Sequence, residues 1–84
     1  MKIKPTFTLP YGYKVHTKIQ SPKQFLKAGA GIHDLAFWCG SSQTIYLRSD
    51  RAPVEVWADY IHELEHAWVD YRWWLQNRLV SGSG

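Results

Sequence analysis

The stretch Pro53–Leu79, PVEVWADYIHELEHAWVDYRWWLQNRL, decides the fold of this 84-residue chain, because nothing in it breaks a helix. Asp50 or Ser49 stands just before it and is suited to cap its first turn. Bulky apolar side chains recur at alternating spacings of four and three: Trp57, Ile61, Leu64, Trp68, Tyr71 and Leu75. This period predicts one apolar stripe, which we expect to pack on a sheet. The opposite face is then expected to carry Asp59, His62, His66 and Asp70, with Trp73 beside them.

The first third of the chain is expected to hold a strand and a short helix. Pro10 and a turn-forming Tyr-Gly-Tyr sequence separate a short extended piece from a strand around Tyr13–Ile19. Ser21 and Pro22 fit the N-cap and the first position of a helix over Lys23–Ala28, which the following glycines end.

The middle of the chain is expected to form a β-hairpin. Two runs rich in apolar residues, Asp34–Cys39 and Thr44–Arg48, flank the turn-forming sequence Gly-Ser-Ser-Gln. The predicted fold is therefore α+β, with a small antiparallel-rich sheet, a short helix and one long helix laid on the sheet.

Length and composition limit the chain to one small domain. With 45% apolar and 15% aromatic residues it can form a core. At this size a metal, a partner or a second copy is expected to add to a marginal stability. We assign residues 1–80 to the domain, and Ser81–Gly84 has the composition of a linker, so the natural chain is expected to continue further.

A single cysteine, Cys39, excludes an intrachain disulfide and zinc fingers that need two or more cysteines. The sequence has no apolar run long enough for a signal peptide or a membrane span. Both observations favour a cytoplasmic protein that does not act at a membrane.

Charge is distributed unevenly along the chain. Residues 1–33 hold six lysines and no acid, whereas residues 34–84 hold four arginines and seven acids, so the two parts carry +6 and −3. Such asymmetry can mark a nucleic-acid-binding surface. However, the lysines are spread out rather than clustered, so we treat nucleic acid as an unlikely partner and such binding as an alternative function.

Within the long helix, residues 62–66 read HELEH, which is the HExxH pattern. His62 and His66 are four residues apart, so they lie one above the other, about 6 Å apart, and can share a zinc ion. Glu63 is rotated by about 100° from His62, which suits a general base acting on a water molecule that zinc activates. The alternative is a solvated helix face with two unrelated histidines.

The ten residues HELEHAWVDY, residues 62–71, resemble the active-site helix of the thermolysin-like gluzincins, in which HELxHAxxDY occurs. They are also similar to the minimal HExxH metallopeptidases of phages and mobile elements. The resemblance covers about residues 34–72 and implies a zincin-like fold, with His62 and His66 as zinc ligands and Glu63 as the catalytic base. It further implies that a substrate peptide binds in extended form along the hairpin strand Asp34–Cys39.

The resemblance does not supply a third zinc ligand, although catalytic zinc sites usually have three. The gluzincin ligand is a glutamate on a later helix, and no acid follows Asp70 here. The metzincin pattern is disfavoured, because Val69 and Arg72 replace its glycine and third histidine. The alternatives are Asp70, which could instead hydrogen-bond to His66 as a supporting group, His33 or Cys39, a later segment, or a residue of a second copy.

Other polar groups could assist the reaction. Asp59 could orient the ring of His62, and Tyr71 or His33 could stabilise an oxyanion. We therefore expect a zinc-dependent metallopeptidase, more readily an endopeptidase than an exopeptidase, that cleaves a peptide or protein. A catalytically inactive zincin-like binding module is the main alternative, and a homodimer would account for exposed tryptophans at Trp73 or Trp74.

Overall fold

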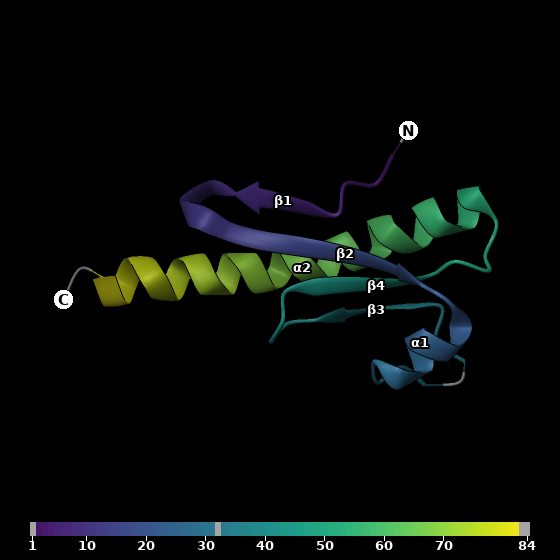
Figure 1. The fold of residues 1–84 in the computed structure, drawn as a ribbon. Helices are drawn as coiled ribbons and strands as arrows, with labels where there is room; N and C mark the ends of the chain where they lie inside the picture. The colour runs from purple at the N-terminus through teal and green to yellow at the C-terminus, as the bar shows by residue number, and fades with distance from the viewer. Residues whose placement is uncertain (1, 32, 83–84) are drawn as a thin grey trace.

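A computed structural model describes residues 2–31 and 33–82, with side chains described as far as Arg78. It has four strands, a short 3₁₀ turn and two α-helices, and α2 lies behind the sheet along its length (Figure 1). The helix α1 lies at one end of the sheet, and the last turns of α2 extend past the strands (Figure 1). The α+β architecture with one short and one long helix is therefore confirmed.

The sheet contains β1 (Thr6–Leu9), β2 (Tyr13–Gln20), β3 (Ala36–Cys39) and β4 (Thr44–Arg48) in the order β1-β2-β4-β3. The pairs β1–β2 and β3–β4 are antiparallel, whereas β2 and β4 run parallel. The sheet is thus mixed, with two antiparallel pairs out of three. A parallel pair needs a long crossover, and here residues 21–43 supply it with α1 and β3.

The antiparallel β1–β2 hairpin closes through the 3₁₀ turn η1, Pro10–Gly12. Tyr11 and Gly12 both have positive φ, 69° and 86°, which glycine adopts without strain and tyrosine adopts rarely. From α2, the buried hydroxyl of Tyr71 donates a hydrogen bond to the Pro10 carbonyl at 3.0 Å. This bond ties the turn to the long helix.

The helix α1 spans Pro22–Lys27 and begins as predicted. Ser21 and Gln24 form a capping box, in which each side chain accepts from the other's backbone N–H at 3.3 Å. Phe25 is fully buried, and its ring lies 5.4 Å from that of Phe37 on β3. This contact holds α1 against the end of the sheet.

The helix α2 spans Pro53–Gly82, so residues 81 and 82 continue the helix rather than forming the predicted linker, and Ser83–Gly84 lie outside the described residues. The predicted cap, Asp50 or Ser49, was wrong, because the helix begins at Pro53 and Ala52 is the residue before it. Asp50 pairs with Arg48 at 2.7 Å. The N–H of Ala52 instead donates to Glu55 Oε1 at 3.0 Å, which satisfies one backbone donor of the first turn.

The face of α2 that packs on the sheet overlaps the predicted stripe in part: Tyr71 is buried, and Trp57, Leu64 and Leu75 pack partly buried against the core. Ile61 and Trp68, which were expected to be buried, are 54% and 53% exposed. The buried residues of the helix are Tyr60, Glu63, Ala67 and Tyr71. At about 100° per residue, the helix is rotated by roughly 80° from the predicted orientation.

Aromatic packing against β2 explains this rotation. The ring of Tyr13 lies 5.3 Å from that of Tyr71 and 5.0 Å from that of Trp74. The small Ala67, 2% exposed, occupies the middle of the contact. The core is completed by Val15, Ile45 and Leu47, all fully buried beneath the helix. The sequence periodicity identified the helix, but these contacts decided which side faces inward.

We expect Tyr71→Phe to lower the free energy of unfolding by about 1 kcal/mol, because the Pro10 carbonyl loses its donor while the ring packing is kept. Urea denaturation followed by circular dichroism would measure this change. Tyr11→Phe, which alters an exposed tyrosine of the same turn, is the matched control and should have little effect. Equal stability of Tyr71→Phe and the wild type would contradict the role of this bond.

Candidate metal and catalytic site

His62 and His66 are both exposed on α2, one turn apart, with their ring centres 5.1 Å apart and their planes at 80°. Two imidazoles bound to one tetrahedral zinc at about 2.0–2.1 Å have ring centres roughly 5 Å apart. The spacing of this histidine pair therefore fits a shared zinc ion. The pair lies on the flank of α2 toward β3, not opposite the sheet as predicted, because of the helix rotation.

Glu63 points toward the sheet and is only 7% exposed. It lines a cavity of about 300 Å³ together with Trp38, His66, Val69 and Asp70. Burial raises the pKa of its carboxyl above the ordinary value, and the nearby His66 and His62 partly oppose this rise. A carboxylate that is costly to ionise, placed beside the histidine pair, is suited to accept a proton from a bound water.

Asp70 lies one turn after His66 on the same cavity wall. Its Oδ2 accepts a hydrogen bond from the indole Nε1 of Trp38 on β3, at 2.5 Å. A Cβ atom placed on Gly40 would lie 2.9 Å from the same oxygen, so only glycine fits against this carboxylate without a shift. The position of Asp70 is therefore set from β3 and the β3–β4 turn.

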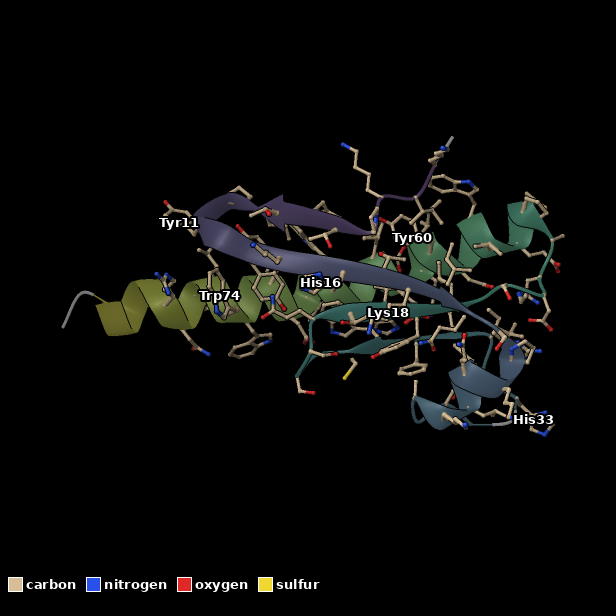
Figure 2. The ribbon with its side chains drawn as sticks, viewed as in Figure 1. Tyr11, His16, Lys18, His33, Tyr60 and Trp74 are labelled. Atoms are coloured by element: carbon tan, nitrogen blue, oxygen red, sulfur yellow. The ribbon has the colours of Figure 1, made fainter. Side chains whose placement is uncertain are left out.

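His33 and Cys39 do not reach the histidine pair. Figure 2 shows the His33 side chain at the outer end of the molecule beside α1, directed away from α2. Cys39 pairs with Thr44 in the sheet, next to the Trp38–Ile45 pair whose side chains face α2, so it points to the opposite face. Hydrogen bonds with Ser41 and Ser42 lower the pKa of its thiol to about 7.

Two further predicted groups are engaged elsewhere. Asp59 was expected to orient His62, but its carboxylate accepts from Arg51 Nε at 2.7 Å and Nη2 at 3.3 Å. The hydroxyl of Tyr71, a candidate for oxyanion stabilisation, bonds to Pro10 beneath the β1–β2 turn. Neither side chain lines the cavity beside Glu63 and His66.

The predicted residues that come together are thus His62, Glu63, His66 and Asp70. Within residues 2–31 and 33–78, no group of three His, Cys, Asp or Glu side chains is arranged to hold a metal ion. The described site therefore consists of two adjacent imidazoles, a buried carboxylate beside them, and the carboxylate of Asp70 on the same cavity wall as His66.

Sequence reasoning missed Trp38 and Gly40, which position Asp70. The hairpin prediction placed Trp38 near the end of its first strand and Gly40 in the turn, but only the strand pairing and the rotation of α2 bring the indole to the carboxylate. An indole N–H that points toward a helix usually needs an acceptor there, and this was the available signal.

Comparisons with protein-family models, with curated proteins and with solved structures found no match. In the described part of the chain, no helix is both long and apolar enough to cross a membrane. The chemistry of the site therefore follows from its own geometry.

The raised pKa of Glu63 predicts how stability depends on pH in the metal-free protein. The folded chain holds the Glu63 proton more tightly than the unfolded chain does. The stability associated with this proton is therefore fully present below the unfolded pKa of about 4.3 and is lost as pH rises through the folded pKa. Glu63→Gln cannot ionise.

The Tm of Glu63→Gln minus the Tm of the wild type should therefore be larger at pH 7 than at pH 4. The two differences should be several degrees apart for an effect of about 1 kcal/mol. Thermal unfolding with a chelator present measures this difference. The same difference in Tm at both pH values would show that burial of the carboxyl is unimportant.

Proposed function

We propose that this protein is a zinc-dependent peptidase that uses the HExxH histidines as metal ligands and Glu63 as the general base. The observation that carries the proposal is the histidine pair with ring centres 5.1 Å apart, one of them sharing a cavity with a buried carboxylate. The resemblance of residues 62–71 to the gluzincin helix supports the same chemistry.

When bound, zinc lowers the pKa of a coordinated water toward about 7 and polarises a carbonyl group. The two imidazoles would hold the ion on the exposed side of α2. Glu63 takes the proton of the attacking water and returns it to the leaving amine. Its burial keeps bulk water away and raises its proton affinity, which suits both steps.

The substrate is an extended peptide that adds to the sheet beside β3. This strand forms one edge of the sheet, and its Trp38 lines the same cavity as Glu63 and His66. A peptide paired with the outer edge of β3 would gain backbone hydrogen bonds. Its scissile bond would then lie next to α2, where the base is held.

Asp70 supports His66 rather than serving as the third ligand. Its Oδ2 accepts from Trp38 Nε1, and His66, one helical turn earlier, lines the same cavity. A carboxylate held in this way can accept the second ring N–H of a ligating histidine, which fixes the ring and raises its basicity. Because only two protein ligands come from the described residues, zinc should bind less tightly here than at a three-ligand site.

Zinc content tests the metal site directly. We expect protein equilibrated with excess zinc and then desalted to contain zinc in an amount comparable to the protein, and His62→Ala and His66→Ala to contain much less. Elemental analysis measures this content, and His16→Ala, a histidine on β2 bonded to Thr6, is the matched control. Zinc content that does not change in His66→Ala would overturn the proposed site.

Peptide cleavage tests the role of the base. Glu63→Gln should retain zinc but cleave a random peptide library at least about 100-fold more slowly, because it lacks the proton acceptor. Mass spectrometry of the products measures cleavage. Glu55→Gln, which changes an exposed carboxylate in the first turn of the same helix, should behave like the wild type. Wild-type protein that binds zinc without cleaving any peptide would favour the inactive binding module instead.

Trp38→Phe and Asp70→Asn should each weaken zinc binding by about 10- to 100-fold, because His66 loses its oriented partner. A competition titration against a zinc chelator measures the affinity. Trp73→Phe alters an exposed tryptophan of α2 and serves as the control, with no expected change. Unchanged affinity in both test variants would show that Asp70 has no part in holding the ligand.

A further inference from the structure

The outward face of α2 carries several bulky apolar side chains among its polar residues. Bulky side chains on it are more than half exposed: Val54 76%, Ile61 54%, Trp68 53%, Val69 51% and Trp73 61%. A helix that packs on a single sheet normally turns charged and polar residues toward solvent. Exposed apolar area of this extent on a small protein usually marks an interaction surface.

Part of this face borders an apolar groove of about 580 Å³. The groove lies between the β1–β2 hairpin and α2 and is lined mainly by Phe7, Leu9, Val15, Ile61, Leu64 and Trp68. It lies on the β1 side of the helix, whereas the cavity beside Glu63 and His66 lies on the β3 side. Val69 borders both.

The exposed stripe repeats at spacings of four and three, as in helices that pack against other helices. Its members are Val54, Ala58, Ile61, Glu65, Trp68 and Arg72. Glu65 and Arg72 are its two charged residues, and they lie seven residues, or about 10 Å, apart on either side of Trp68. The stripe thus has opposite charges placed symmetrically about an apolar centre.

We propose that this face binds a second copy of the same chain, with the two α2 helices packed antiparallel about a two-fold axis that passes close to Trp68. In this arrangement Glu65 of one copy lies beside Arg72 of the other, and the contact occurs twice. Such self-complementary charge is what an isologous interface requires.

The exposed apolar side chains and the groove extend along much of α2. The helix is about 45 Å long at 1.5 Å per residue, and the groove extends its apolar face onto β1 and β2. Stable dimers bury roughly 800 Å² per partner. Trp68 is the natural anchor, because a tryptophan half exposed beside an apolar groove can enter the equivalent groove of the other copy.

The proposed interface is centred away from the cavity beside Glu63 and His66, and Val69 borders both. His66 lines the cavity on the β3 side of α2, whereas the stripe turns toward β1. The inference therefore does not depend on the proposed peptidase activity.

Reversal of the two charges tests the proposal. Analytical ultracentrifugation should show wild-type protein as a dimer in the micromolar range. Glu65→Arg and Arg72→Glu, each of which places two like charges together, should each weaken the dimer by at least roughly tenfold. The double variant Glu65→Arg/Arg72→Glu should restore it, because the opposite charges meet again. Both residues are exposed, so circular dichroism should show each variant folded.

Each other outcome contradicts a named part of the proposal. Monomeric wild-type protein would overturn the second copy as occupant and leave a different partner for the face. Single variants as dimeric as the wild type, or a double variant that stays monomeric, would overturn the antiparallel pairing of Glu65 with Arg72. Ile61→Lys, which alters only the apolar stripe, should also produce monomers, and a dimer that persists in this variant would place the interface elsewhere. Lys14→Glu on β2 is the charge-reversal control and should remain dimeric.

Discussion

The packing of Tyr71 and Trp74 against Tyr13 sets the rotation of α2, and with it the place of every functional side chain in this protein. Because Tyr71 also bonds to the Pro10 carbonyl, the helix is held both by the face of the sheet and by the β1–β2 turn. A helix rotated toward the predicted stripe would bury Ile61 and Trp68 and would turn Glu63 to solvent. The observed rotation instead buries Glu63 and exposes the apolar residues, so the site and the outward apolar face result from one constraint.

This constraint also explains how far the sequence alone could predict the fold. The hairpin, the short helix with its Ser21 cap and the long helix follow from local patterns, and the structure contains all three. The inward face of α2 could not be predicted, because apolar residues occupy two adjoining stripes of the helix and only contacts with β2 choose between them. The parallel pairing of β2 with β4 joins residues far apart in the chain and leaves no local signal.

The same division holds for the site. His62, Glu63 and His66 could be predicted because a helix brings residues i and i+4 together wherever it lies. The environment of these residues could not be predicted, because it depends on contacts with other parts of the chain. Asp70 was identified by its spacing, but its partner Trp38 comes from β3, and the fit of Gly40 against its carboxylate depends on the β3–β4 turn. The spacing of Asp59 from His62 suggested that its carboxylate orients the His62 ring. Instead, Arg51, which precedes the helix, donates hydrogen bonds to this carboxylate.

The burial of Glu63 links stability to chemistry. An ionised carboxylate between a helix and a sheet disfavours the folded state, and a small domain can tolerate little of this cost. His62 and His66 reduce it when they carry positive charge, as the opposing effects on the Glu63 pKa indicate. A metal cation held by the same two rings would reduce it further, because a nearby positive charge favours the ionised carboxylate. A metal ion at the proposed site would therefore both stabilise the fold and favour the ionised form of Glu63, which is the form that accepts a proton.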